Sequence, residues 1–118
     1  MLNLNISLLY SFLFFLVLHI AVWFSANLQL VNSSLSSKSF YIMLFLALPI
    51  SVLAYYGTRY GYEAFNESAW GVRFFAFAIS YLVFPILTWW FLGESMFTVK
   101  TLLCVALSFF IILVQLYM

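Results

Sequence analysis

Few side chains in this sequence could do chemistry, and two of them fall inside long apolar runs. Arg73 is charged, and such a group within an apolar run needs protein, water or the membrane surface nearby. Arg73 could bind an anionic head group, a phosphate or a carboxylate; the simpler alternatives are that it snorkels to the surface or pairs with Glu63 or Glu67. His19 belongs to the residue type that changes charge near neutral pH, so it could support proton coupling or could simply be packed and hydrogen-bonded.

Ser80 and Tyr81 extend this set of candidate side chains. Arg73, Ala76 and Ser80 follow one another at spacings of three and four, which places them on one helical face. Tyr81 belongs to an aromatic set that makes up 23% of the chain, which we interpret mainly as lipid contacts and interfacial belts rather than as a cage for a cation. We predict substrate contacts from Arg73, Ser80, His19 and Tyr81.

Catalysis is not indicated by any residue pattern. The sequence contains no metal-ligand cluster, no nucleophile with a base, no glycine-rich phosphate loop and no paired buried carboxylates. The single cysteine, Cys104, cannot form an intrachain disulfide. We therefore expect no enzyme activity, no catalytic residue, no metal and no cofactor, and the absence of a basic run argues against nucleic acid as a partner.

The composition predicts the elements that position these residues. Apolar residues make up 68% of the 118 residues and charged ones 6%, whereas soluble domains are about half apolar and a quarter charged. One crossing of a bilayer takes about 20 residues, so four crossings and short loops fill the chain. We predict an all-α polytopic protein with one domain over residues 1–118, the lipid bilayer as its surroundings, and transmembrane helices over 6–24, 40–56, 70–92 and 99–117.

The ends of the predicted spans carry aromatic and polar residues. Trp23 is expected to mark a membrane interface, as Trp89 and Trp90 do at the end of the third span. Residues 25–39 are the most polar segment and are predicted to be the longest loop. Residues 57–69 are predicted to be a short loop in the aromatic interface.

Small residues predict where helices approach one another. Two sets recur at helical spacing, and both are expected to serve helix packing, with a substrate-lining role as the alternative for the first. The first lies in the second span: Ala47, Ser51, Ala54 and Thr58. The second lies in the fourth span and is expected to contact another helix, in this chain or in a second copy: Thr101, Cys104 and Ser108. Pro49 should bend the second helix.

A hairpin centred on Gly93 joins the last two spans. Thr98 is expected to cap the start of the fourth helix, and Ser68 that of the third. Glu94 is expected to accept backbone N–H groups or to favour the positive end of the fourth helix, with Lys100 as a possible ion-pair partner. We interpret Gly93, Glu94 and Thr98 as structural.

An even number of spans places both termini on one side of the membrane. That side would also carry Arg59 and Arg73, while the other side carries Lys38 and Lys100. Each side thus carries two basic residues, so the positive-inside rule does not predict which side faces the cytoplasm. Mixed insertion would permit an antiparallel dimer of identical chains, with the twofold symmetry in the membrane plane that many transporters have.

The third and fourth spans also carry a family resemblance. Four short spans, Trp70-Gly71 near the start of the third, and Leu92-Gly93-Glu94 followed by Thr98 resemble the drug/metabolite transporter superfamily, in particular the small multidrug resistance and four-span EamA-like proteins. The specific part covers Trp70 to Gln115. The resemblance implies a dimer that moves a small organic or lipid-linked solute by alternating access, across a cavity lined by the first three spans, and we expect it in a cytoplasmic (inner) membrane.

The chain departs from that family at its best-known position. Small multidrug resistance proteins carry a glutamate in the first span, whereas residues 6–24 contain no Asp or Glu. Glutamate-dependent drug/proton antiport is therefore not expected. The alternative from another class is a non-transporting membrane subunit or scaffold that docks a larger partner; a small channel is disfavoured because no ring of charge is evident.

Overall fold

Four helices account for nearly all of the chain in this computed structural model, which describes residues 2–32, 34 and 36–117. The helices are α1 (Leu2–Val31), α2 (Ser36–Ala64), α3 (Ala69–Leu92) and α4 (Val99–Tyr117). The described residues form no strand, and each helix contains a stretch long and apolar enough to cross a membrane. The prediction of an all-α protein with four membrane-spanning helices is confirmed, so the chain is an integral membrane protein.

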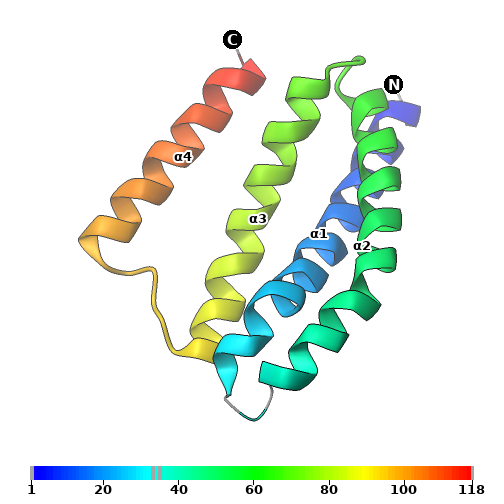
Figure 1. The fold of residues 1–118 in the computed structure, drawn as a ribbon. Helices are drawn as coiled ribbons and strands as arrows, with labels where there is room; N and C mark the ends of the chain where they lie inside the picture. The colour runs from blue at the N-terminus through cyan, green and yellow to red at the C-terminus, as the bar shows by residue number, and fades with distance from the viewer. Residues whose placement is uncertain (1, 33, 35, 118) are drawn as a thin grey trace.

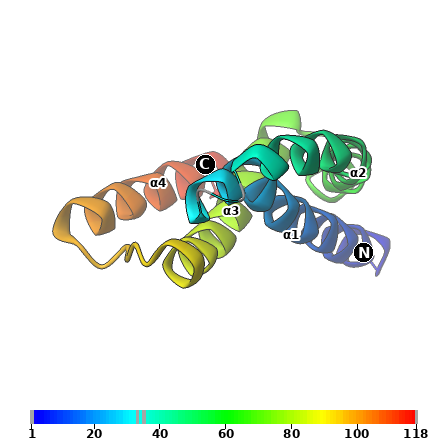
Figure 2. The same cartoon turned by 60° about the horizontal axis from the view of Figure 1, so that its bottom comes forward.

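The four helices form an open row rather than a closed bundle (Figures 1 and 2). Helices α1 and α2 lie side by side, α3 packs on α1 and to a lesser extent on α2, and α4 packs on α3 alone among the described residues. The molecule measures 49 × 37 × 19 Å, so its smallest dimension is about two helix diameters. Both termini and the α2–α3 connection lie at the same end of the helices, at the top of the view in Figure 1.

Helices α1 and α2 are longer than the sequence predicts. Most of the loop predicted over 25–39 is helical, and so is 57–64, so both loop predictions are wrong over these parts; positions 33 and 35 lie outside the described residues. Polar side chains in this added part of α1 bond the backbone of their own helix: Asn27 Nδ2 donates to the Trp23 carbonyl at 3.1 Å, and Gln29 Nε2 to that of Ala26 at 2.9 Å. A span predicted from composition ends where the apolar run ends, whereas α1 and α2 continue beyond that point.

The contact between α1 and α2 rests on two buried glycines. Ser11 Oγ donates to the carbonyl of Gly57 at 2.8 Å. A Cβ atom added at Gly57 would lie 2.9 Å from Cε1 of Phe15, and one added at Gly61 would lie 2.8 Å from Oγ of Ser11. The two helices therefore approach more closely than side chains at 57 and 61 would allow.

The small-residue face predicted for the second span is not the packing face. Ala47, Ser51 and Thr58 are exposed, and only Ala54 is half-buried. The glycines take this role because they alone remove the Cβ from the contact, whereas Ala, Ser and Thr keep it. Helix α2 also changes direction near its middle, where Pro49 was expected to bend it (Figure 1).

Trp23 belongs to the core between α1 and α3. Its side chain is 2% exposed, and its Nε1 donates to Oγ1 of the buried Thr88 at 3.0 Å. The ring of Trp23 does not face outward, as a ring at the predicted interface would, because Thr88 satisfies the indole N–H and the ring can be buried. Trp89 and Trp90, predicted for the far aromatic belt, are 65% and 73% exposed.

The connection between α3 and α4 is capped at both ends. Gly93 adopts a left-handed conformation (φ 71°), and its N–H donates to the Trp89 carbonyl at 3.1 Å. Thr98 Oγ1 accepts from the N–H of Thr101 at 3.2 Å, which is the predicted cap of α4. Ser95 Oγ accepts from the N–H of Phe97 at 3.0 Å, so Ser95 makes the kind of bond expected of the exposed Glu94.

The predicted cap of α3 is also present. Ser68 has an extended backbone and its Oγ accepts from the N–H of Gly71 at 3.0 Å. The turn before it contains Asn66 and Glu67, both with positive φ (55° and 64°). This turn fixes the start of α3, and with it the position of Arg73 one turn further on.

Candidate functional site: two cavities that share His19

His19 lies on α1 and is half-buried. Its Nδ1 is 2.8 Å from the carbonyl oxygen of Phe15, one turn earlier. Because a carbonyl oxygen can only accept, Nδ1 carries the proton of this bond. In the neutral imidazole, Nε2 is therefore left as a hydrogen-bond acceptor for a ligand.

The first cavity, here the central cavity, lies between α1 and α3 and has a volume of about 390 Å³. Its polar lining comes from His19, Asn27, Ser80 and Tyr81, and its walls include Trp23 and Phe77. An apolar cavity with a few polar groups is the usual form of a site for a small organic molecule. Three of the four residues predicted to contact substrate therefore meet here.

The fourth, Arg73, lines a second cavity of about 210 Å³, here the arginine cavity. This cavity lies among α1, α2 and α3 and has both His19 and Phe77 in common with the central cavity. The guanidinium carbon of Arg73 is 4.8 Å from the ring centroid of Phe77, within the range of a cation–π contact. The four predicted residues thus line two cavities linked through His19 and Phe77.

On α3 the central cavity lies at the middle of the helix, and on α1 it extends from His19 to Asn27, in the second half of that helix. Ser80 and Tyr81 are the central residues of α3, and Ser108 is the central residue of α4. Tyr81 Oη donates to Ser108 Oγ at 2.9 Å, and Ser108 Oγ donates to the Cys104 carbonyl at 2.9 Å. If each helix crosses the bilayer, these groups lie near its midplane, where transporters commonly place their binding sites.

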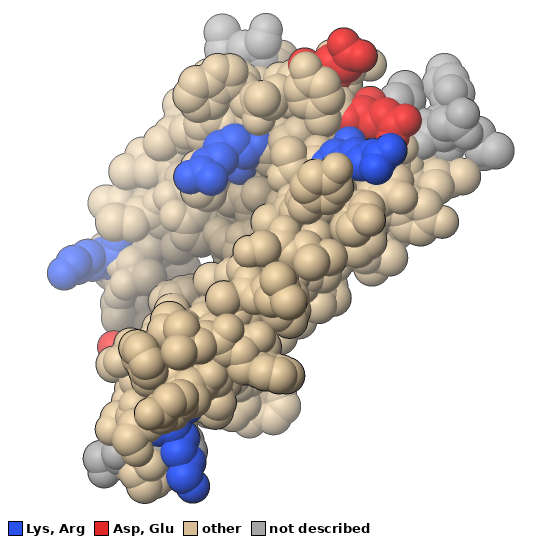
Figure 3. Space-filling view, turned by 45° about the vertical axis from the view of Figure 1, so that its right-hand side comes forward, with Lys and Arg blue, Asp and Glu red and all other residues tan. Residues whose placement is uncertain are grey.

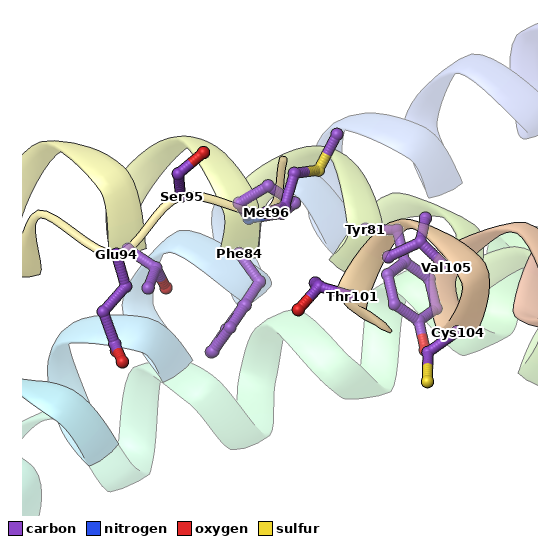
Figure 4. Close-up of a pocket in the computed structure, with 10 residues that line it drawn as sticks. Tyr81, Phe84, Glu94, Ser95, Met96, Thr101, Cys104 and Val105 are labelled. Atoms are coloured by element: carbon purple, nitrogen blue, oxygen red, sulfur yellow. The ribbon is translucent and has the colours of Figure 1, made fainter. Parts of the chain in front are cut away.

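A third cavity of about 340 Å³ opens between α3 and α4, and three of the remaining predicted residues line it (Figure 4). Thr101 and Cys104, predicted for helix or dimer contact, line it from α4, and Glu94 lines it from the connection. In Figure 4, Thr101 points into the space between the helices, and Glu94 extends in the same direction as the Phe84 ring. Ser108, in contrast, contacts α3 of the same chain through Tyr81.

No acidic residue is among the described residues that line the two cavities sharing His19. The sequence has three acidic residues: Glu63 accepts a hydrogen bond from Ser7 Oγ at 3.2 Å, Glu67 lies in the α2–α3 turn, and Glu94 lies in the α3–α4 connection. Basic and acidic groups lie together near the end that carries the termini, and uncharged surface fills the middle of the face in Figure 3.

Arg73 has no carboxylate partner within the described part of the chain. The pairing with Glu63 or Glu67 that the sequence allowed is not made, and Arg73 packs on Phe77 instead. Its side chain is exposed, so the guanidinium can reach a ligand, lipid or water. The arginine cavity therefore has one positive group and no acidic one in its lining.

Of the polar residues that line these two cavities, Asn27 was missed from the sequence, and for Thr58 helix packing was preferred over a lining role. Asn27 lines the central cavity and Thr58 the arginine cavity. His19, Trp23 and Asn27 are spaced by four and so share one face of α1, a signal that continuing the helix past Phe24 would have revealed. Thr58 was assigned to helix packing, and nothing in its spacing separates the two roles.

The fold and the cavities define an integral membrane protein with four helices and mid-depth polar groups. No family model matches the chain, and no curated protein or solved structure matches it either.

Proposed function

We propose that the protein carries a small organic or lipid-linked solute across the membrane by alternating access, with the central cavity as the binding site. The observation that supports this most is the meeting of His19, Ser80 and Tyr81 in one cavity at the middle of α3. A few polar groups in an otherwise apolar, mid-depth cavity suit a carrier, which must bind and release its solute at one place.

The resemblance to the drug/metabolite transporter superfamily supports the same proposal. We propose that the chain acts as a homodimer in a cytoplasmic (inner) membrane, with its two copies antiparallel where insertion is mixed. A row of helices only 19 Å thick leaves its cavities open at the side, and a second copy would close them. Glutamate-dependent antiport is not part of the proposal, because α1 carries no acidic residue.

Filling the central cavity tests the proposal. Solutes that raise the melting temperature of the purified protein are first selected from amines, amino acids, nucleotide sugars and lipid phosphates, since a ligand stabilises the folded state that binds it. Uptake of a selected solute into liposomes is then measured. Ser80→Phe should lower the uptake rate at least about tenfold, because the ring occupies the site.

Ser51→Phe is the matched control. Ser51 and Ser80 both lie near the middle of a helix and both bond a carbonyl of their own helix, at 2.9 and 2.6 Å, but Ser51 is exposed on α2 outside the central cavity. Ser51→Phe should therefore transport normally. Equal uptake by wild type and Ser80→Phe, with both proteins folded, would contradict transport through this cavity.

A second function, that of a non-transporting subunit or scaffold, is favoured by one observation. Helix α4 packs on α3 alone within the described residues, and it leaves Leu103, Leu107 and Phe110 exposed. These side chains suit either lipid or a larger partner. A chain that is stable only with another polypeptide would favour the subunit, whereas a homodimer stabilised by a class of solutes would favour the carrier.

A further inference from the structure

The charge of the two cavities that share His19 restricts the ligand they can hold. Arg73 supplies a positive charge, and none of the three acidic residues of the sequence lines either cavity. Arg73 also has no ion-pair partner in the described part of the chain. A charged group at the edge of a hydrocarbon region is stabilised by an opposite charge, and residues 2–32, 34 and 36–117 do not supply one to Arg73.

His19 adds a second requirement. Its Nδ1–H is used by the Phe15 carbonyl, so neutral His19 presents Nε2 as an acceptor. The other titratable or charged groups that line these cavities are Arg73 and Tyr81, both on α3; α2 contributes only Ala54 and Thr58 to this lining. A ligand that donates a hydrogen bond near its anionic group would satisfy both His19 and Arg73.

Resting on the proposed carrier function, we propose that the transported solute is a small organic acid that carries a hydroxyl or amino donor next to its carboxylate. Its carboxylate binds the Arg73 guanidinium, its donor binds Nε2 of His19, and its apolar body packs along Phe77, which lines both cavities. A bidentate bond between a guanidinium and a carboxylate is among the stronger hydrogen-bonded pairs.

Three probes of similar shape separate the contributions of charge and donor: mandelate, phenylacetate and 2-phenylethylamine. Binding is measured at pH 8, where an ordinary imidazole is neutral. Mandelate should bind about 2- to 10-fold more tightly than phenylacetate, the value of one neutral hydrogen bond. The amine should not compete for binding, because its ammonium group and the Arg73 guanidinium are both positively charged.

Substitutions at the two residues should act differently. Arg73→Gln should weaken both acids about 10- to 100-fold, as expected for losing a charged hydrogen-bond partner, and Arg73→Lys should retain part of the affinity. His19→Asn can keep a donor for the Phe15 carbonyl but lacks Nε2, so it should remove only the advantage of mandelate over phenylacetate. Arg59→Gln, an exposed arginine in neither cavity, is the control and should change nothing.

The outcomes also separate this inference from the carrier proposal. Preference for the amine, binding of none of the probes, or unchanged affinity in Arg73→Gln overturns the organic-acid class. In each of these cases, a loss of uptake of some other solute in Ser80→Phe would still support the carrier function. Equal loss of both acids in His19→Asn overturns the donor contact alone. Tight binding of mandelate without uptake into liposomes would keep the ligand class and refute the carrier.

Discussion

At the scale of single residues, the bond between Trp23 and Thr88 decides how α1 meets α3. The indole Nε1 and the threonine Oγ1 are 3.0 Å apart, and both side chains are buried. In a hydrocarbon surrounding, neither group can exchange this partner for water, yet measured side-chain bonds between membrane helices are modest, about 0.6 kcal/mol on average. The bond therefore orients the helices more than it holds them together.

Trp23→Phe should lower the free energy of unfolding by more than the roughly 0.6 kcal/mol of the bond itself, because the N–H is lost and the smaller phenyl ring leaves part of the buried indole site empty. Unfolding in a denaturing detergent, followed by helical circular dichroism, measures the effect. A double-mutant cycle with Thr88→Val isolates the bond, and a coupling energy of zero would show that it contributes nothing. Trp89→Phe, at a position that is 65% exposed, is the control and should be close to neutral.

At the scale of helices, close contact between α1 and α2 depends on backbone exposed by glycine. Ser11 bonds the Gly57 carbonyl directly, and Val72 of α3 also reaches Gly61: a Cβ there would lie 3.1 Å from its Cγ1. Three helices thus meet at Gly61. Without a hydrophobic drive between helices in lipid, such close packing supplies much of the attraction.

Gly61→Ala should destabilise the protein by about 1–3 kcal/mol, the usual cost of overpacking. Alanine is more favourable than glycine within a helix by about 1 kcal/mol, which opposes the overpacking cost. The sign of the measured stability change therefore tells whether overpacking or helix propensity is larger. Thermal unfolding in detergent measures it. The cost should be smaller in a Ser11→Ala background, and the exposed Ser51→Ala should be nearly neutral; stabilisation by Gly61→Ala would show that the helices are further apart.

At the scale of the whole molecule, the row of helices is thin and carries few charges. Both termini and the α2–α3 turn lie at one end, and the start of α2 lies at the other (Figure 1). Arg59 and Arg73 belong to the first end, and Lys38 and Lys100 to the second. Because the bias of Lys and Arg between the two sides sets membrane orientation, an equal number on each side favours neither orientation.

Mixed orientation predicts labelling from both sides of the membrane. In a Cys104→Ser background, Ser37→Cys places a thiol at an exposed position near the start of α2, and Ala69→Cys places one at the opposite end. An impermeant thiol reagent applied to intact cells should label a portion of each variant. Labelling of only one of the two would establish a single orientation and exclude the antiparallel dimer.

Much of the fold could be predicted from the sequence because a membrane helix requires a long run of apolar residues, which is visible in the sequence. Helices α3 and α4 were predicted within one residue at each end, since Ser68, Gly93 and Thr98 mark where the apolar runs begin and stop. The ends of α1 and α2 were missed because both helices continue into polar segments beyond the apolar runs, where residues such as Asn27 and Gln29 bond the backbone of α1.

By itself, the sequence determined the membrane class, the number of helices and the four candidate side chains Arg73, His19, Ser80 and Tyr81. Only the tertiary structure decided that these four line cavities sharing His19, that Gly57 and Gly61 form the contact with α1, and that Trp23 is buried. The physical reason is that lipid is as apolar as a protein core, so in a chain that is 68% apolar polarity distinguishes few helical faces, and close packing together with a few side-chain hydrogen bonds selects the partner.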